Sequence, residues 1–284
     1  MQSMSREPLV SIVMGSFNAS PYITESIDSV LSQTYANWEL IVVDDASTDH
    51  TARLVEDVSK RDSRVKLIRR EVNSNRPAVA RNTGLESATG DFVAFLDHDD
   101  LWYPRKLERH VLAHLKRPDI DLTHSAMLNY PNRLELRSFR TLPNPLLQKA
   151  GVQELRNWNR IVHSSVVART NVVRELGGFD ESIDLRAIED YHLWLRFAEV
   201  GRLGFIPEVL GKYRVLTHGT YVQADQAKLR VALAATGVLD GAPLKRASGP
   251  AALKKFASLP AKASLYGLVG PLRGLRGSPP LVLG

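Results

Sequence analysis

The amino-acid sequence predicts an α/β protein in which a mainly parallel sheet carries helices on both of its faces. Short apolar runs alternate with segments of helical periodicity between residues 9 and 115. Each run has the length of a buried strand, and turn-forming residues separate it from the helix that follows. Sheets of this class bind ligands beyond the carboxyl ends of their strands. Functional residues are therefore expected directly after the apolar runs.

Three strand–helix pairs follow one another from the N-terminus. The expected strands cover residues 9–14, 38–43 and 65–68. The expected helices begin at about residue 20 and cover residues 51–58 and 77–88. In the first helix Ser20 is placed as N-cap and Pro21 as first helical residue. The apolar face of this helix consists of Ile23, Ile27, Val30 and Leu31.

A fourth pair follows the turn formed by Gly90 and Asp91. The strand is expected at residues 92–96, and Pro104 begins the helix behind it. Leu107, Val111 and Leu115 give that helix one apolar face.

Residues 120–220 are less regular, and a helix at about residues 188–200 is their clearest element. We take them as the second half of one domain that covers residues 1–220. Another helix is expected at residues 223–239. The Ala, Gly, Pro, Lys and Arg bias from Gly241 onward predicts a loosely held extension, so that residues 221–284 form an appendage.

The positive charge of the chain is confined to this extension. The 284 residues carry a net charge of +6, and the segment after Gly241 contains no acid but seven cations: Lys245, Arg246, Lys254, Lys255, Lys262, Arg273 and Arg276. Residues 1–240 therefore carry about −1. This distribution argues against nucleic acid as a partner. It predicts peripheral contact of the extension with an anionic membrane, with a solvated extension as the alternative.

The chain contains no cysteine, which excludes disulfides, thiolate metal sites and cysteine nucleophiles. Any metal must bind to oxygen or imidazole. The segment "MQSMSREPLV" has no features of a secretory signal, and no window reaches about 18 apolar residues. We therefore expect a cytoplasmic protein, attached at most peripherally to the inner face of the membrane.

Polar clusters follow three of the expected strands. They are "GSFN" at residues 15–18, "DDAST" at 44–48 and "DHDD" at 97–100. In a parallel sheet these clusters converge on one edge. Each also has a structural interpretation, because Asp and Ser residues commonly form turns and cap helices.

The cluster "DHDD" is the hardest to explain by capping alone. Its three acids repel one another unless a cation or water spreads their charge, whereas a cap needs one acid. Carboxylates at alternating positions suit Mg²⁺ or Mn²⁺, which leave coordination positions for phosphate oxygens. The spacing leaves both interpretations open.

Two histidines, His110 and His114, lie four residues apart on a predicted helix, as some metal ligands do. No "HExxH" surrounds them, and Lys116 and Arg117 follow. We therefore expect both histidines on a solvated face of the helix.

Further charged residues lie at the starts of two helices. Arg76 and Arg81, in "RPAVARNTG", are interpreted either as surface charges or as contacts to an anion. Glu189 and Asp190 stand in a first helical turn, where the helix dipole favours acids. A carboxylate in that place could instead act as a general base.

Together, these segments resemble the family 2 glycosyltransferases of the GT-A fold. The resemblance covers roughly residues 8–215 and rests on "PLVSIVMGSFNAS", "SVLSQTYANWELIVVDDASTDHT", "VARNTGLESATGDFVAFLDHDDLWYPRKLE", "VVRELGGFDES" and "EDYHLWLR". It implies a nucleotide-diphospho-sugar donor, most simply a UDP-sugar, a divalent metal and inversion at the anomeric carbon. It also implies a nucleotide-binding half at about residues 8–100 and an acceptor half at about 101–220.

The resemblance assigns most of the polar clusters to the donor. The residues implied in nucleotide binding are Gly15, Ser16, Phe17, Asn18, Asp44, Asp45, Arg76, Arg81, Asp97 and His98. Asp97 and Asp99 match the DxD motif of the family. Asp99 is the implied metal ligand, with Asp97 nearer to the ribose and donor sugar. His218 resembles a late histidine that completes the metal or phosphate site in some relatives.

Asp190 matches the catalytic base of the family, and Glu189 its acidic neighbour. The Gln-x-x-Arg-Trp motif and membrane spans of processive synthases are absent from the sequence, which favours transfer of a single sugar. Many relatives have Pro and Thr where Gly15 and Ser16 stand, so the sequence departs from the family at two of the residues implied in nucleotide binding.

The sequence thus predicts a metal-dependent, inverting glycosyltransferase that acts on a glycan, lipid-linked or other hydroxyl acceptor in cell-surface polysaccharide or glycoconjugate synthesis. A nucleotidyltransferase is one alternative, but "MGSFNASPY" lacks the glycine-rich, lysine-bearing triphosphate loop of that class. A non-catalytic nucleotide- or sugar-binding protein is the other, and Asp190 argues against it.

Overall fold

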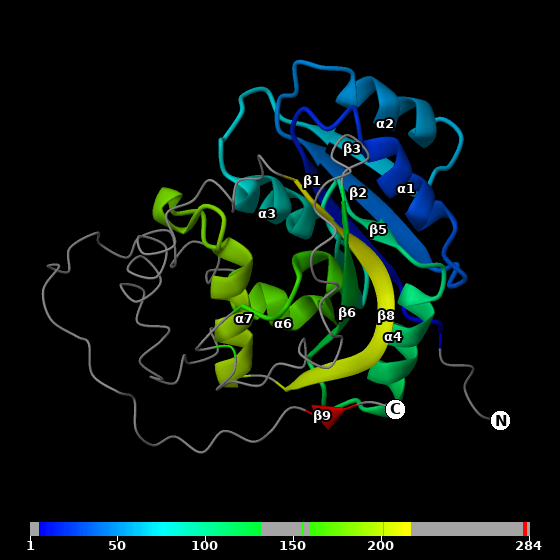
Figure 1. The fold of residues 1–284 in the computed structure, drawn as a ribbon, viewed down its shortest axis with the longest axis vertical. Coiled ribbons are helices and arrows are strands. Elements are labelled where there is room, and N and C mark those ends of the chain that lie inside the picture. Colours follow the sequence, from blue (N-terminus) through cyan, green and yellow to red (C-terminus); the bar gives the residue numbers. More distant parts are fainter. Residues whose placement is uncertain (1–5, 132–154, 156–158, 201, 217–280, 283–284) are drawn as a thin grey trace, which may run out of the picture.

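The structure is a computed structural model, and it describes residues 6–131, 155, 159–200, 202–216 and 281–282. Within these ranges, nine strands form one sheet in the order β3-β2-β1-β4-β7-β6-β8-β5, and β9 pairs with β8 (Figure 1). The predicted α/β architecture with a largely parallel sheet is confirmed.

The first half of the sheet is parallel. It consists of β1 (Val10–Ser16), β2 (Trp38–Asp44), β3 (Val65–Arg69) and β4 (Phe92–Phe95). All side chains of β2 and β4 are buried, as expected for strands covered on both faces. The register pairs Ser16 of β1 with Asp44 of β2, and Val13 of β1 with Phe95 of β4. The polar segments after these strands therefore start at the same edge.

Helices cover both faces of this half. They are α1 (Ile23–Leu31), α2 (Thr51–Ser59), α3 (Pro77–Ser87) and α4 (Lys106–Lys116). The apolar residues of α1, α2 and α4 pack with Ile12 and Met14 of β1, whereas α3 packs with the opposite face, on Val13. The alternation of side chains along β1 thus separates two cores.

The start of α1 differs from the prediction. The helix begins at Ile23, and its N-cap position is Tyr22, which makes no side-chain capping bond. The backbone N–H of Ser20 donates to Asp49 Oδ2 over 3.1 Å. Ser20 and Pro21 therefore belong to the loop before the helix, because the loop bonds with residues 47–51 hold this segment outside the first turn.

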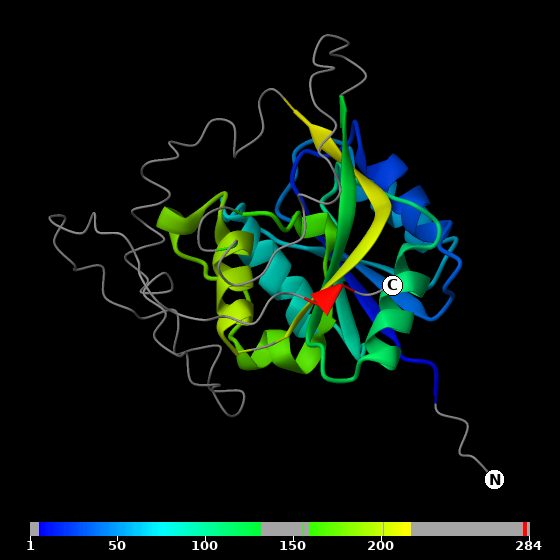
Figure 2. The same ribbon diagram turned by 60° about the horizontal axis from the view of Figure 1, so that its bottom comes forward.

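The second half mixes strand directions. Its strands are β5 (Leu101–Trp102), β6 (Leu122–Pro131), β7 (Val167–Arg169) and β8 (Leu203–Val215), and its helical segments are η2 (His163–Ser165), α6 (Thr170–Glu175), η3 (Ile183–Leu185) and α7 (Glu189–Val200). Strand β7 is antiparallel to β4 and β6, while β6 and β8 run parallel as a long pair (Figure 2). This half brings η2 and the start of α7 to the edge where β4 ends.

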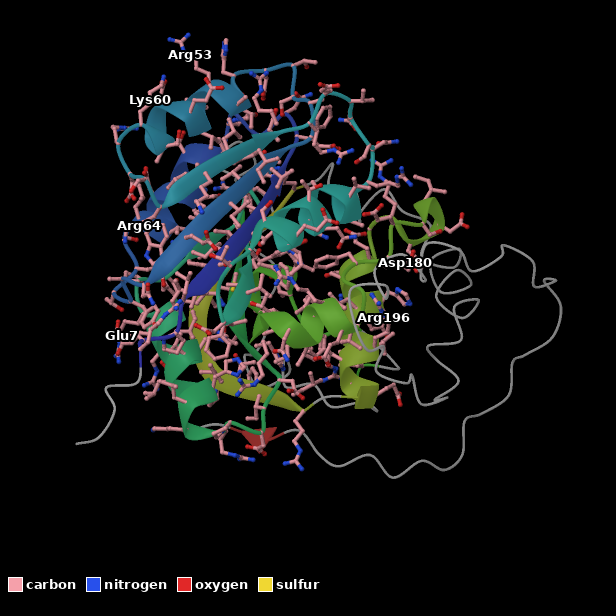
Figure 3. All side chains as sticks on the ribbon, turned by 180° about the vertical axis from the view of Figure 1, so that it is seen from behind. Glu7, Arg53, Lys60, Arg64, Asp180 and Arg196 are labelled. Atoms are coloured by element: carbon pink, nitrogen blue, oxygen red, sulfur yellow. The ribbon has the colours of Figure 1, made fainter. Side chains whose placement is uncertain are left out.

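The connection between α6 and α7 is fixed by a buried arginine. Arg196 of α7 donates to the carbonyls of Leu176 and Gly178, at 2.7 and 2.5 Å. Gly178 has φ of +68° and ends α6 with a bond from its N–H to the Val173 carbonyl. Asp180 and Arg196 lie on the same side of the molecule, away from Arg53 on α2 and Lys60 directly after it (Figure 3).

The prediction of a solvated face for His110 and His114 was wrong. Both are buried in α4, with 0% and 1% exposure. His110 Nδ1 lies 2.8 Å from the hydroxyl of Thr123 on β6, and His114 Nε2 lies 3.1 Å from the same oxygen. Thr123, Lys106 and backbone carbonyls provide hydrogen-bond partners for their nitrogens, so both side chains can be buried between α4 and the sheet.

The predicted helix at residues 223–239 and nearly all of the basic extension lie outside the described residues. Leu281–Val282, however, form β9, which pairs with Gly204 and Phe205 at the start of β8. Among the helices described, none has the length and apolar character needed to cross a bilayer.

Candidate active site

The three predicted polar clusters meet at one edge of the sheet. Ser16 and Asp44 are paired across β1 and β2, and the Asp45 N–H donates to the Ser16 carbonyl over 2.8 Å. His98 Nδ1 lies 3.2 Å from the carbonyl of Gly15. The predicted convergence is therefore present, and it follows from the parallel arrangement of β1, β2 and β4.

The loop after β1 has a fixed shape. Asn18 has φ of +48°, and its backbone N–H and side-chain oxygen bond to Ser47 and Thr48, both at 2.9 Å. Phe17, beside it, is 44% exposed. A Cβ added to Gly15 would lie 3.3 Å from Ala80 Cβ, so the strand end packs closely on α3. The loop therefore presents an aromatic ring to solvent at the strand end.

The acids after β2 are already engaged within the protein. Asp45 Oδ1 lies 2.7 Å from Arg70 Nε, and its Oδ2 accepts the N–H and hydroxyl of Ser74. Asp44 is fully buried, and its Oδ2 accepts the Ser47 N–H at 3.2 Å. Its Oδ1 is a buried atom with no hydrogen-bond donor in the part of the chain that the structure describes. Asp45 thus orders the loop before α3, and Asp44 keeps one acceptor unused.

Arg76 belongs to the same loop. It precedes α3, and its guanidinium donates to the backbone carbonyls of Glu181, at 3.0 Å, and of Ser74, at 3.4 Å. Asn82 on α3 adds two bonds to Phe179, at 2.8 and 2.9 Å. These contacts tie the loop before α7 to α3 and the loop that precedes it.

The turn after β4 contains the three acids of "DHDD". Asp97, His98 and Asp99 are partly exposed, whereas Asp100 is fully buried. Burial alone would raise the pKa of Asp97, but His163 and Arg81 outweigh it and lower this pKa to about 2. Burial, together with the charge of Asp97, raises the pKa of Asp99, and the pKa of Asp100 is raised well above its ordinary value. The three acids therefore differ in environment.

A buried arginine joins this turn to α7. Arg81 of α3 donates from Nη2 to Asp97 Oδ1 over 2.8 Å and from Nη1 to Glu189 Oε1 over 2.5 Å. Arg81 is 9% exposed and Glu189 is 3% exposed. The guanidinium thus fixes two carboxylates from different halves of the domain. The Arg81 side chain is buried, and no observation in the structure tests its predicted contact with a nucleotide.

Asp190 lies beside this ion pair in the first turn of α7. It is partly buried, and its Oδ1 accepts the backbone N–H of Tyr191 at 2.6 Å. Burial and the neighbouring charge of Glu189 raise the pKa of Asp190 to about 7, while Arg81 acts in the opposite direction. Asp190 is therefore poised to exchange a proton near neutral pH.

Sequence reasoning missed His163, Ser164 and Arg214, which all contact the "DHDD" turn. His163 is buried against Phe95, with ring centroids 5.1 Å apart, and its Nε2 lies 3.8 Å from Asp97 Oδ1. Burial lowers the pKa of His163 to about 3, so Arg81 supplies the lasting positive charge beside Asp97. Only the fold brings these residues to the turn, because they lie in the irregular second half of the sequence.

Asp97 and Asp99 offer the oxygen ligands that Mg²⁺ or Mn²⁺ prefers, at a partly exposed sheet edge. Within the described ranges, no group of three or more His, Asp or Glu side chains is arranged to hold a metal ion. His218, the third predicted ligand, lies outside them. The two acids fit part of a metal site, whose remaining ligands would come from diphosphate, water or His218.

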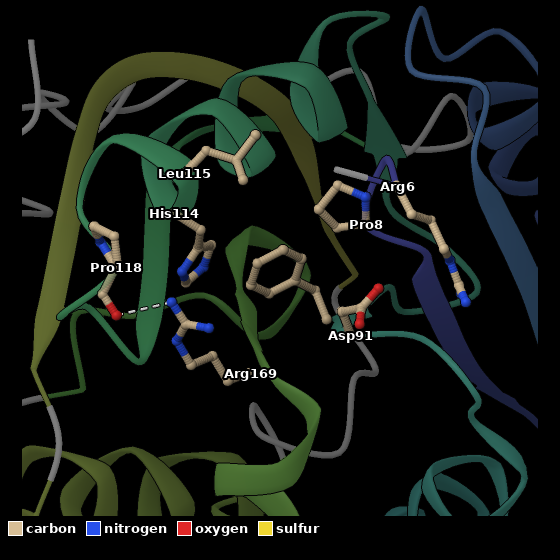
Figure 4. Close-up of a pocket in the computed structure, with 8 residues that line it drawn as sticks. Arg6, Pro8, Asp91, His114, Leu115, Pro118 and Arg169 are labelled. Carbon is tan, nitrogen blue, oxygen red and sulfur yellow. Dashed lines mark hydrogen bonds between the residues drawn. The ribbon is translucent and has the colours of Figure 1, made fainter. Parts of the chain in front are cut away.

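One pocket lies away from these residues, at the opposite end of β4 (Figure 4). It is lined by Arg6, Pro8, Asp91, Phe92, His114, Leu115, Pro118 and Arg169. Arg169 donates there to the Pro118 carbonyl at 2.8 Å. No residue predicted for the active site lines this pocket, so it is separate from the edge just described.

Comparison with known proteins identifies the family of this chain. The model of the Glycosyl transferase family 2 matches residues 11–176. The putative glycosyltransferase EpsE of Bacillus subtilis is 38% identical over 213 residues, which are 74% of this chain and 74% of EpsE. WfgD of Escherichia coli, a UDP-Glc:alpha-D-GlcNAc-diphosphoundecaprenol beta-1,3-glucosyltransferase, is 36% identical over 212 residues, which are 73% of this chain and 77% of WfgD.

Solved structures share the fold. S. aureus TarS 1-349 in complex with UDP-GlcNAc has a TM-score of 0.68 and 20% identity, over 87% of this chain and 70% of TarS. Mannosyltransferase PcManGT from Pyrobaculum calidifontis, in complex with GDP-Man and Mn²⁺, has a TM-score of 0.58 and 23% identity, over 89% and 74% of the two chains. The fold and these relatives define a glycosyltransferase of the GT-A fold. The chain belongs to glycosyltransferase family 2.

Proposed function

We propose that this protein transfers one sugar from a UDP-sugar to an acceptor hydroxyl with inversion, and that Asp190 is the general base. The observation that carries the proposal is the difference between two adjacent acids. Glu189 is paired with Arg81, whereas Asp190 has a pKa raised to about 7. A base with a pKa near the working pH combines a useful fraction of the basic form with sufficient proton affinity.

The reaction is a single displacement. The Asp190 carboxylate takes the proton of the acceptor hydroxyl while the acceptor oxygen bonds to the anomeric carbon. The bond from that carbon to the diphosphate oxygen breaks, and the nucleoside diphosphate leaves with the electron pair. Attack from the face opposite the leaving group inverts the anomeric centre, so no covalent intermediate with the protein is needed.

The loops after β1 and β2 are proposed to bind the nucleotide. The exposed ring of Phe17 offers a face for stacking on a base. Asp44, which the resemblance assigns to the nucleotide, lies buried at the end of β2. Gly15, Ser16, Asn18 and Asp45 shape this loop, with Arg76 at its far side. The diphosphate and the donor sugar are proposed to lie near His98, Asp97 and Arg81. Complexes of related folds with UDP, UDP-GlcNAc and GDP-Man support a nucleotide-sugar donor.

Asp99, with Asp97, is proposed to hold Mg²⁺ or Mn²⁺. A bound divalent cation supplies positive charge to the leaving diphosphate. Asp97 is suited to this role because its pKa is lowered to about 2, which keeps it ionised. The PcManGT complex with Mn²⁺ and GDP-Man supports a metal in this fold. His218 is proposed as a further ligand on the resemblance alone.

The acceptor is proposed to be a glycan, with a lipid-linked glycan as the first choice for testing. WfgD is named for a sugar on diphosphoundecaprenol, and another relative, TuaG of Bacillus subtilis, for teichuronic acid biosynthesis. These names support a role in cell-surface polysaccharide synthesis. Such acceptors occur at the membrane, so we further propose a cytoplasmic protein whose basic extension contacts anionic lipid.

The decisive experiment incubates the purified chain with UDP-sugars, Mn²⁺ and a short lipid-diphosphate sugar. We expect one sugar to be added, with an anomeric configuration opposite to that of the donor when the product is examined by NMR. A product with the donor's configuration contradicts the single displacement. Hydrolysis of the donor without transfer to any glycan or lipid-linked acceptor contradicts the proposed acceptor class.

A further inference from the structure

The turn that contains Asp97 and Asp99 ends in Asp100, an acid that differs from them in its burial. Asp100 is fully buried, and its N–H donates to the Asp97 carbonyl over 3.1 Å, which closes the turn. Asp97 and Asp99 remain partly exposed. A ligand at the edge of the sheet can therefore reach the first two carboxylates, whereas the third faces the interior.

Both oxygens of Asp100 are occupied inside the protein. Oδ1 accepts the backbone N–H of Arg214 on β8 at 2.8 Å, and Oδ2 accepts the hydroxyl of Ser164 on η2 at 2.5 Å. The Ser164 oxygen in turn accepts the N–H of Asp97 at 3.0 Å. A single serine thus joins the first and last residues of the turn.

The remaining backbone groups of the turn are held as well. Ser26 on α1 lies 2.7 Å from the His98 carbonyl and 2.8 Å from the Asp100 carbonyl. Arg214 Nε donates to the Asp99 carbonyl over 2.8 Å, and its Nη2 donates to Glu25 on α1 over 2.9 Å. Three elements that are far apart in the sequence therefore fix the backbone from which Asp97 and Asp99 project.

We propose that Asp100, Ser164 and Arg214 form a positioning unit, which sets the direction of the Asp97 and Asp99 carboxylates toward the donor diphosphate and its cation. Asp100 is then a support and not a ligand. The inference rests on the proposed function, because it concerns the turn that this function assigns to the donor. Groups that orient metal ligands typically change metal affinity or activity 10- to 100-fold when they are removed.

Ser164→Ala tests the unit most directly, because it deletes the hydroxyl that joins Asp97 and Asp100. The probes are UDP and Mn²⁺, titrated into the purified full chain by calorimetry, with Mn²⁺ binding followed independently by electron paramagnetic resonance. We expect the Kd for Mn²⁺ in the presence of UDP to rise about 10- to 100-fold. The kcat at saturating Mn²⁺ should fall much less than the affinity, because Asp97 and Asp99 are still present.

Ser165→Ala is the matched control. Ser165 is the neighbour in η2, and its hydroxyl donates to the Val162 carbonyl at 2.7 Å instead of to the turn. It should keep wild-type Mn²⁺ affinity. Thermal unfolding of both variants, measured first, separates a loss of fold from a loss of positioning.

Asp100→Asn is the second variant, because it keeps the shape but replaces the acceptor of the Ser164 hydroxyl by an amide. If the residues act as one unit, the double variant with Ser164→Ala should lose little more affinity than either single variant. Wild-type Mn²⁺ affinity in both folded single variants overturns the proposal. So does complete loss of UDP–Mn²⁺ binding in Asp100→Asn at every metal concentration, because that is the behaviour of a ligand.

A failure of the proposed function gives a different pattern. Wild-type protein that binds UDP equally with and without Mn²⁺ contradicts the metal role. The positioning unit then still predicts weaker UDP binding in Ser164→Ala than in Ser165→Ala, because Asp97 is displaced. Equal UDP affinity of those two variants overturns the unit in that case too.

Discussion

Arg81 and Glu189 form a buried ion pair, with Nη1 and Oε1 2.5 Å apart, and this pair distinguishes the two acids at the start of α7. Glu189 has a permanent cation beside it, and Arg81 shares that charge with Asp97. The pKa of Asp190 is raised to about 7 by burial and by the charge of Glu189. The adjacent carboxylates therefore have different surroundings, which supports the proposed role of Asp190 as the general base.

The first prediction is that Asp190→Asn lowers the rate of sugar transfer about 10²- to 10⁴-fold, the usual contribution of a general base. The variant keeps the size and polarity of the side chain but removes its basic lone pair, so UDP and Mn²⁺ affinities should stay at wild-type values. Transfer rates and calorimetry on the same preparation check both parts. Asp184→Asn, an exposed acid in η3, is the control and should transfer normally. Near wild-type turnover of Asp190→Asn would exclude Asp190 as the general base and leave Glu189 as the candidate.

The second prediction concerns the pH dependence of turnover. Asp190 must be deprotonated to act, and burial together with Glu189 raises its pKa to about 7. The kcat should therefore rise about tenfold per pH unit below about pH 7 and level off above it. Rates at saturating donor and acceptor from pH 5.5 to 8.5 test this. A profile that is already flat at pH 5.5 would show that no group of this pKa limits the reaction.

The strands around the site could be predicted because each is an apolar run that ends in polar residues. The strands at residues 38–43 and 65–68 end within one residue of β2 and β3, and the meeting of three clusters follows from the parallel pairing. The partner of Glu189 could not be predicted in this way. The pair with Arg81 spans the two halves of the domain, and only tertiary packing brings them together.

The third prediction is that Arg81→Met destabilises the protein strongly, because it leaves the buried Glu189 and the partly exposed Asp97 without their shared cation. Breaking a buried ion pair from one side typically costs about 3–5 kcal/mol. The free energy of unfolding, measured with urea at pH 7.5, should fall by this order. Arg117→Met serves as the control, because its ion pair with Asp119 is on the surface, and it should change stability little. Equal stabilities of the two variants would contradict a stabilising role for the ion pairs of Arg81 with Asp97 and Glu189.

The fourth prediction concerns the cation. UDP should bind more tightly in the presence of Mn²⁺ than in its absence, and Asp99→Ala should abolish both this difference and transfer, because the carboxylate proposed to hold the cation is lost. Calorimetric titration of UDP, with Mn²⁺ and with a chelator, measures the difference. Asp91→Ala is the control, since that acid lies at the opposite end of β4 and should retain the Mn²⁺ effect. Equal UDP affinities with and without Mn²⁺ in the wild type would remove the metal from the mechanism.

The histidines show where a pattern in the sequence gave the wrong environment. Lys116 and Arg117 suggested a solvated face for His110 and His114, but the charges lie at the end of α4 and the histidines face the sheet. Hydrogen bonds to Thr123, to Lys106 Nζ and to backbone carbonyls satisfy their ring nitrogens. A single sequence does not reveal such partners, because Thr123 is on a different element, β6.

The fifth prediction follows from these buried rings and concerns acid stability. Burial lowers the pKa of His114 to about 4 and those of His124 and His163 to about 3, from an ordinary value of 6.5. Between the lowered pKa values and 6.5, these histidines are protonated in the unfolded chain but neutral in the folded chain. The contribution of these neutral histidines to the free energy of unfolding is therefore fully present above about pH 6.5. It is lost as the pH falls toward 4, by about 1.4 kcal/mol per pH unit for each such histidine. Asp190, whose pKa is raised to about 7, acts in the opposite direction in part of this window.

His124→Phe isolates one of these protons. The ring nitrogens of His124 are buried and have no hydrogen-bond partner among the described residues, so a ring of similar size without a basic nitrogen should be accommodated beside Phe205. Between pH 6.5 and pH 5, the urea-measured stability of the variant should fall less steeply than that of the wild type, by up to about 1.4 kcal/mol per pH unit. Ser125→Ala, at the next position of β6, leaves every histidine in place and should keep the wild-type slope. Parallel pH profiles of His124→Phe and the wild type would mean that His124 takes up its proton without unfolding the protein.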